Sequence, residues 1–222
     1  MNVRARAAVA AALALATSLA VAQDDPRRFR LIPFTEMTPA QKAYADAVMA
    51  GPTSSTGSAA VVPGSATIGA PFNVYLRSPD LAMAVKNVGE YIRFKTSLPL
   101  KLNELAILVT ARHYTAQYEW FAHHRLALKE GLDPKIADEL AQGRRPTGMS
   151  NDEALVHDFS KALHADRGTV DDALFKAMRD RFGEQGVVDL IAVNGYYAFV
   201  SMILNVDRTP VPGGKSPLPV LK

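Results

Sequence analysis

Two side chains suited to acid–base chemistry stand four residues apart within a helical pattern. Glu119 and His123 are separated only by Trp-Phe-Ala. Residues at positions i and i+4 lie on one helix face, about 5–6 Å apart at Cβ, so the carboxylate can orient the imidazole and set its basicity. An imidazole titrates near neutral pH and can accept or donate a proton there. The spacing predicts an acid–base pair; the alternative is a helix-face histidine that is hydrogen-bonded into the core or an interface.

A third ionisable group, Glu104, opens the preceding helical segment. It stands beside the apolar run 105–109, where a charged residue needs a reason to be present. Glu104 either relays or positions a proton, or it only complements the positive end of its helix. Glu119 has a structural alternative too, as an ion-pair partner of Arg112 or Arg125. Both questions stay open at the level of the sequence.

Aromatic residues near this pair are candidates for contacting a substrate. A tyrosine lining a pocket for an organic acid or an aromatic compound is one interpretation, and a core or interface position is the other. These candidates are Tyr118, Trp120, Tyr196 and Tyr197. His124 points about 100° away from His123 around the helix, so we expect it to lie outside the site. His113, His157 and His164 are scattered, and we assign them no role.

The sequence offers little for a metal or a cofactor. Glu119 and His123 could supply two metal ligands, but further ligands would have to come from Glu104 or His113 without zinc-type spacing. We therefore predict no metal. Gly-rich phosphate loops, GxSxG elbows and Rossmann fingerprints are absent, so no cofactor is predicted either. The chain has no cysteine, which excludes thiol redox chemistry and disulfides.

The first 22 residues have the pattern of a secretory signal peptide. Arg4 and Arg6 precede the apolar stretch 7–19, and Ala20-Val-Ala22 forms a small-x-small site before Gln23. The apolar stretch is too short for a stable membrane span, so we predict cleavage after Ala22 and a periplasmic or secreted protein. An uncleaved N-terminal anchor is the alternative.

The remaining residues, 23–222, fit a single domain with a full hydrophobic core. The chain carries 25 Lys and Arg against 22 Asp and Glu, so no large basic field for nucleic acid is implied. After cleavage we expect no membrane partner, only a small-molecule substrate and further copies of the chain.

Helix signals recur along the whole chain, whereas alternating strand patterns with hairpin turns are absent. The pattern predicts an all-α protein with helices over 39–51, 79–92, 100–114, 116–130, 134–140, 150–165, 170–182 and 184–205. Residues 51–71 should form a long loop, and 207–222 an extended tail. The apolar stretch 187–204 is interrupted by Asp189, Asn194 and Ser201. Since such groups are costly in lipid, a buried central or interface helix is the better interpretation.

Several segments resemble the carboxymuconolactone decarboxylase family, whose members share the alkylhydroperoxidase D-like all-helical fold. These segments are Pro71–Pro79, Leu98–Leu108, Ala116–His123, Gly131–Pro134 and Asn194–Tyr197. The resemblance implies a bundle of about eight helices that forms a homo-oligomer, often a trimer or hexamer, with sites near subunit interfaces. We expect the loop 51–71 and the tail to drape over neighbouring subunits in such an assembly.

The family contains two chemistries. Its thiol peroxidases carry Cys-x-x-Cys-x-x-x-His with a glutamate nineteen residues before the histidine, a spacing that Glu104 and His123 keep. Ala116 and Glu119 stand at the two cysteine positions, so dithiol peroxidase activity is excluded. The decarboxylases carry Glu-x-x-x-His, which Glu119 and His123 match.

We therefore predict a cofactor-independent enzyme of decarboxylase or lyase type that acts on a small organic acid, lactone or aromatic-derived compound. His123 would transfer a proton to or from a carbon atom of the substrate. Glu119 would orient the imidazole, and Glu104 would relay or position the proton. The alternative is an exported, non-catalytic ligand-binding or structural protein that kept the fold after losing the cysteines.

Overall fold

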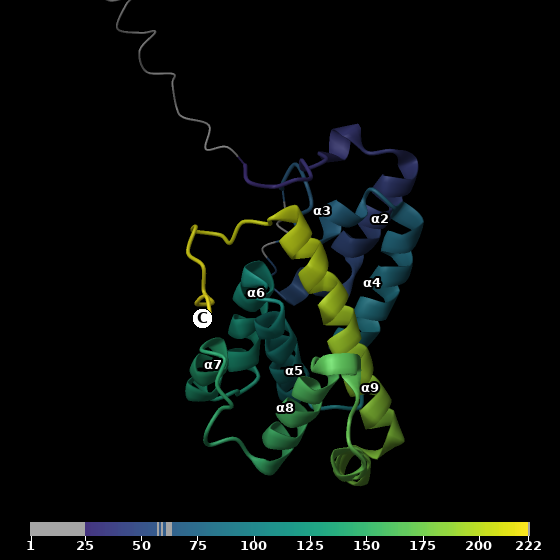
Figure 1. Ribbon diagram of the computed structural model, residues 1–222. Helices are drawn as coiled ribbons and strands as arrows, with labels where there is room; N and C mark the ends of the chain where they lie inside the picture. The colour runs from purple at the N-terminus through teal and green to yellow at the C-terminus, as the bar shows by residue number, and fades with distance from the viewer. Residues whose placement is uncertain (1–24, 57, 59, 61–63, 222) are drawn as a thin grey trace, which may run out of the picture.

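The protein is helical throughout the part of the chain that the structure describes. The computed structural model describes residues 25–221 except 57, 59 and 61–63, so the predicted signal peptide lies outside the described residues. The α-helices in Figure 1 are α2 (Pro39–Ala50), α3 (Phe72–Tyr75), α4 (Pro79–Phe94), α5 (Leu100–His113), α6 (Gln117–Lys129), α7 (Pro134–Ala141), α8 (Asn151–Leu163) and α9 (Asp172–Asp207). Short 3-10 turns cover Phe34–Glu36, Pro52–Thr56 and Asp166–Gly168. The described residues contain no strand, which confirms the all-α prediction.

Capping residues explain where several helices begin. The Thr38 hydroxyl accepts from the backbone N–H of Gln41, whose side chain accepts from the Thr38 N–H in return. Ser150 and Glu153 form the same reciprocal pair before α8. Each pair satisfies N–H groups that a helix start leaves without a partner, and each start agrees with the sequence prediction.

Helix α9 contains a break where the sequence predicts a boundary between two helices. Gly183 has φ 71° and ψ 175°, a conformation that glycine adopts without the clash of a Cβ atom. The break separates 172–182 from 184–207, close to the predicted helices 170–182 and 184–205.

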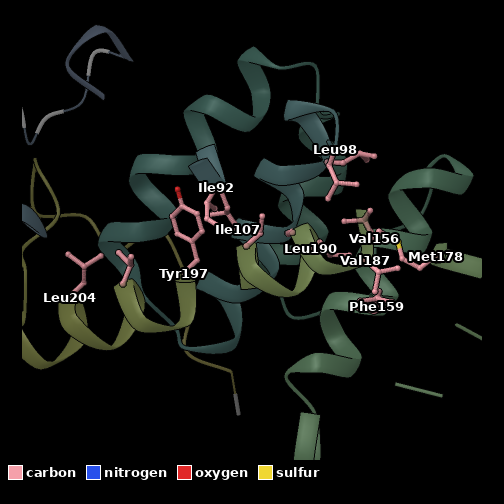
Figure 2. Packing of buried hydrophobic residues seen from close by; sticks show 14 of the residues in the cluster. Ile92, Leu98, Ile107, Val156, Phe159, Met178, Val187, Leu190, Tyr197 and Leu204 are labelled. Carbon is pink, nitrogen blue, oxygen red and sulfur yellow. The ribbon is translucent and has the colours of Figure 1, made fainter. Parts of the chain in front are cut away.

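Helix α5 lies at the centre of the molecule and determines where the polar groups must go. It packs against α6, α8 and α9, and every residue from 102 to 112 is buried. Figure 2 shows the cluster in which α4, α5, α8 and α9 interleave, including Ile92, Ile107 and Phe159. Burying such a side chain stabilises the fold by roughly 1.5–3 kcal/mol. Because α5 is enclosed, Glu104 near its start must find polar partners inside the protein.

Among the described helices, α9 alone is long and apolar enough by length and composition to cross a membrane. Half of its most apolar stretch is buried within the protein. Two of its three polar residues form internal hydrogen bonds: the carboxylate of Asp189 accepts from the backbone N–H of Ser97 at 2.7 Å and from its hydroxyl at 2.8 Å. Asn194 donates to the Leu190 carbonyl at 2.8 Å. Such internal hydrogen bonds support the interpretation of 187–204 as a core helix.

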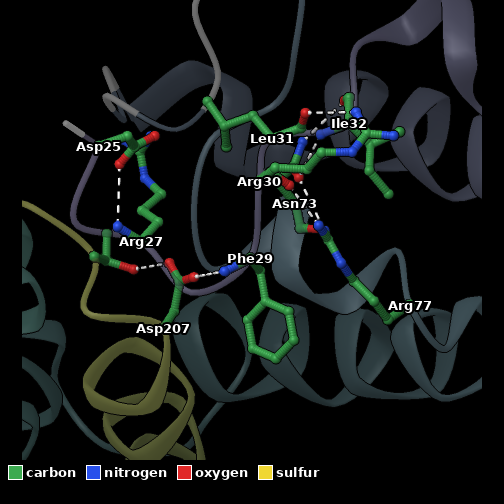
Figure 3. A network of polar contacts seen from close by, with 10 residues as sticks. Asp25, Arg27, Phe29, Arg30, Leu31, Ile32, Asn73, Arg77 and Asp207 are labelled. Carbon is green, nitrogen blue, oxygen red and sulfur yellow. Dashed lines mark hydrogen bonds and ion pairs between the residues drawn. The ribbon is translucent and has the colours of Figure 1, made fainter. Parts of the chain in front are cut away.

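The N-terminal segment before α2 is tied to the ends of α3 and α9. As Figure 3 shows, Asp207 accepts from the backbone N–H of Phe29 at 3.1 Å. Asn73 accepts from the backbone N–H of Ile32 at 3.0 Å and donates to its carbonyl at 3.1 Å, and Arg77 donates to the carbonyl of Arg30. These bonds hold residues 29–32 in place and give hydrogen-bond partners to backbone groups that belong to no helix.

The loop 51–71 and the C-terminal tail both contact their own chain. The backbone N–H and carbonyl of Leu218 pair with the side chain of Gln117 at 2.8 and 2.9 Å, and Leu218 is 2 % exposed. In the loop, Ala60 and Ile68 are buried in a cluster that includes Tyr44 of α2. Both segments therefore have packing partners on their own chain, and the expectation that they also drape over neighbouring subunits stays a prediction.

Candidate active site

Glu104, Glu119 and His123 meet where α5 packs against α6. Glu104 comes from the second turn of α5, and the other two come from α6. Nδ1 of His123 lies 2.7 Å from Oε2 of Glu104, and Nε2 lies 3.2 Å from Oε1 of Glu119. The three residues are 9 %, 3 % and 6 % exposed in the order Glu104, Glu119, His123. The structure thus brings together all three predicted acid–base residues in a buried position.

Glu104 holds the ring of His123 from one side. At 2.7 Å, Nδ1–H donates a hydrogen bond to the carboxylate. Tyr197 packs edge-on against the ring, with centroids 4.9 Å apart and planes at 76°. A carboxylate that engages one imidazole nitrogen fixes the tautomer and the orientation of the ring. Nε2 is therefore the nitrogen that remains for proton transfer.

Glu119 is the more deeply buried of the two carboxylic acids. Burial raises the pKa of its carboxyl, the charges of His123 and Arg93 act in the opposite direction, and Glu104 adds to the rise. Oε1 of Glu119 and Nε2 of His123 are close but not aligned for a hydrogen bond, and Oε1 has no hydrogen-bond partner among the described residues. A buried polar atom without a partner is costly, and a bound substrate atom beside Nε2 would satisfy it.

A cleft opens beside these three residues, between α4, α6 and α9. Its inner chamber holds about 670 Å³ of space that protein atoms do not fill, part of it open to solvent. An adjoining outer chamber of about 640 Å³ lies over α6 and the turn Pro52–Thr56. Residues that line both chambers are Ser58, Arg93, Tyr118, Ala122 and His123.

Three of the four predicted aromatic residues line the inner chamber: Tyr118, Tyr196 and Tyr197. Trp120 does not. It packs into the core cluster of α5, α6 and α7, and its indole stacks on His124 with centroids 5.9 Å apart. Trp120 is on the face of α6 that turns away from the cleft, so the structure gives it a packing position. His124 lies on that face too, as predicted from its place in the helix.

The polar face of α4 is part of the site that the sequence analysis missed. Lys86, Glu90 and Arg93 all line the inner chamber, and the Lys86 ammonium pairs with Glu90 at 2.6 Å. Their spacing of i, i+4 and i+7 places them on one helix face. That spacing was the available signal, but a charged helix face is more often solvated than functional.

Gly89 lets α9 approach α4 closely at the wall of the cleft. A Cβ atom at this position would lie 2.2 Å from the hydroxyl oxygen of Tyr196. The absence of a side chain at Gly89 therefore allows the Tyr196 phenol to reach the α4 backbone and close one side of the inner chamber.

A metal ion has little to bind here. The described residues contain no group of three or more His, Asp and Glu side chains arranged to hold a metal.

The other histidines lie outside the cleft. His164 contacts the Thr110 hydroxyl at 2.9 Å and Asn194 at 3.1 Å, and it stacks on His113. Burial, followed by the charge of His113, lowers its pKa to about 4. His157 contacts Asp158 at 2.8 Å. His113 and His164 thus link α5 to the end of α8, His157 pairs within α8, and none of the three lines the cleft.

Comparison with known proteins identifies the fold. No protein-family model and no curated protein matches the sequence. Among solved structures, the chain is similar to a crystal structure described as an alkylhydroperoxidase AhpD core, an uncharacterized peroxidase-related protein from Ralstonia eutropha JMP134. The TM-score is 0.68 at 15 % identity, over 84 % of this chain and 93 % of that one. The protein has an alkylhydroperoxidase D-like fold. An identity this low shows the fold alone, because one fold can carry several activities.

Proposed function

We propose that this alkylhydroperoxidase D-like protein is a cofactor-independent enzyme of decarboxylase or lyase type, acting on a small organic acid, lactone or aromatic-derived compound. One observation carries the proposal: His123 is held by Glu104 on one nitrogen and faces Glu119 on the other, at the wall of a cleft. A buried titratable group with a raised pKa, beside an oriented imidazole in a cleft, is typical of acid–base catalysis.

In this proposal His123 delivers the proton and the two carboxylates support it. Loss of CO₂ from a carboxylate that is attached to the carbon next to a carbonyl group leaves the bonding electron pair on that carbon as an enolate. Nε2–H of the imidazolium then donates its proton to the enolate carbon, which forms the new C–H bond and returns His123 to the neutral state. Glu104 stabilises the imidazolium through Nδ1–H, and Glu119 lies 3.2 Å from Nε2, where its charge favours the imidazolium before the proton is transferred. General acid–base help of this kind is worth roughly 10²–10⁴ in rate.

Peroxide reduction by thiols does not extend to this chain. The structural neighbour is described as peroxidase-related. Here the sequence contains no cysteine, and Ala116 and Glu119 occupy the positions of the two thiols. Without a thiolate there is no group to attack the peroxide oxygen.

A substrate screen with matched variants tests the proposal. The mature protein is incubated with a panel of small keto acids, carboxylic acids and lactones, and CO₂ release and substrate loss are followed. We expect at least one compound to be turned over by the wild type and by His124→Ala, and not by His123→Ala. His124 is the matched control because it is the adjacent histidine of α6 and packs on Trp120, away from the cleft. Turnover that persists in His123→Ala would contradict the role of His123, and a lack of turnover with every compound would favour the non-catalytic alternative.

A further inference from the structure

The outer chamber of the cleft is positively charged. Two guanidinium groups line it, those of Arg93 and Arg125, and no Asp or Glu is among its described lining residues. The inner chamber carries the carboxylates, including Glu119. Arg93 lies at the junction because it lines both chambers, together with His123.

Arg93 is poised to bind an anion that the chain itself does not supply. It forms no ion pair with any described carboxylate, and its Nε atom is buried without a hydrogen-bond partner in that part of the chain. Its guanidinium packs on the ring of Phe94, 5.1 Å from the centroid, and its charge acts on Glu119 without an ion-pair contact. By contrast, Lys86 two turns earlier on the same face is paired with Glu90. A partly buried guanidinium without a carboxylate is well matched to a planar, bidentate acceptor.

We propose that Arg93 binds a carboxylate group of the substrate and thereby makes the site specific for small carboxylic acids. The carboxylate would lie at the junction of the chambers, with the apolar part of the molecule against Tyr118 and the exposed ring of Phe121. This position places the rest of the substrate within the chamber that His123 also lines. The role of this carboxylate in catalysis rests on the proposed function. The anion site itself rests only on the contacts of Arg93.

Benzoate and benzamide provide a direct probe, because they share a shape and differ in charge. Binding to the wild-type protein is measured by isothermal titration calorimetry. We expect benzoate to bind and benzamide to bind at least about tenfold more weakly, the usual effect of losing a charge-assisted hydrogen bond. Arg93→Gln should weaken benzoate binding by a similar factor and leave benzamide unchanged. Arg93→Lys keeps the charge but cannot form two parallel hydrogen bonds, so its affinity for benzoate should lie between those of the wild type and Arg93→Gln.

Two further variants separate this inference from the proposed function. Arg144→Gln, at an exposed arginine between α7 and α8, is the matched control and should bind benzoate like the wild type. His123→Ala should lose turnover yet still bind benzoate. Benzoate binding would therefore support the anion site even if no reaction is found. Equal binding of benzoate and benzamide, no binding of benzoate, or benzoate binding that is unchanged in a folded Arg93→Gln would each overturn the role of Arg93.

Discussion

At the scale of single residues, the site depends on how one imidazole is shared between two acids. The helical spacing of Glu119 and His123 predicted their proximity, because the i to i+4 geometry follows from the helix alone. The role of Glu104 stayed open, since its distance to His123 depends on how α5 packs against α6. The structure gives Glu104 the shorter contact, 2.7 Å against 3.2 Å for Glu119. We therefore assign the orienting role to Glu104 and place Glu119 beside the proton-transferring nitrogen.

The burial of Glu119 leads to a prediction about stability and pH. Because its folded-state pKa is raised, the folded protein keeps this proton at pH values where the unfolded chain has lost it. The wild type therefore loses stability as the pH rises above the ordinary glutamate value of 4.5. Glu119→Gln cannot ionise, so its free energy of unfolding should increase relative to wild type as the pH rises from about 4 to about 8. Urea unfolding followed by circular dichroism measures the difference.

The matched control for this prediction is Glu130→Gln, an exposed residue just beyond the end of α6. Its stability should follow that of the wild type across the same range, because its carboxylate stays in water. A Glu119→Gln difference that is flat with pH, or that reverses sign, would contradict the raised pKa.

At the scale of elements, local signals were sufficient for the helix starts and insufficient for the cleft. Thr38, Ser150 and Gly183 act through their own turns, so their effects can be read from a few neighbouring residues. Which face of α4 lines the cleft depends on tertiary packing, and Arg93 was missed for that reason. Trp120 was expected near a substrate because it adjoins Glu119 in sequence. A helix turns about 100° per residue, and this rotation places Trp120 in a different core.

The close approach of α4 and α9 can be tested at two glycines. Gly89→Ala would place a Cβ atom 2.2 Å from the Tyr196 hydroxyl oxygen, so either the phenol or the helix must move. We expect a loss of roughly 1–3 kcal/mol in the free energy of unfolding, the usual cost of overpacking. Gly195→Ala is the control, because a Cβ there meets no atom within 4 Å. It should stabilise the helix by up to about 1 kcal/mol. Thermal unfolding measures the stability change in both variants. Equal changes in Gly89→Ala and Gly195→Ala would contradict the packing described for Tyr196.

At the scale of the whole molecule, apolar side chains remain on the surface of α4 and α9. Val88 is 50 % exposed, and Val188, Ile191 and Met202 are 63 %, 46 % and 47 % exposed. Scattered apolar side chains are normal on a monomer, but a set on two packed helices is typical of a subunit interface. Together with the resemblance noted in the sequence, this supports the prediction of a homo-oligomer, a trimer or hexamer.

Light scattering at micromolar concentration tests the assembly. We expect the wild type to have the mass of a trimer or hexamer, and Val188→Asp to shift it to a smaller species, because a charge buried in an apolar contact is costly. Val220→Asp is the control, since Val220 is 86 % exposed in the C-terminal tail. A monomeric wild type would refute the prediction.

Export is predicted from residues 1–22 alone. If the signal peptide is cleaved after Ala22, the intact mass of protein recovered from the periplasm should correspond to a chain that begins at Gln23. Full-length protein in the membrane fraction would instead support the uncleaved anchor.

The most direct test of the central claim is a double-mutant cycle on Glu119 and His123, measured with a substrate found in the screen. If the two residues serve one proton-transfer step, His123→Ala should abolish turnover and Glu119→Gln should cost nearly as much. The double variant should then be little worse than either alone, because residues that act as a unit are strongly non-additive. His124→Ala should stay close to wild type. Losses that simply add, or a His124→Ala variant as damaged as His123→Ala, would contradict a single acid–base unit in this cleft.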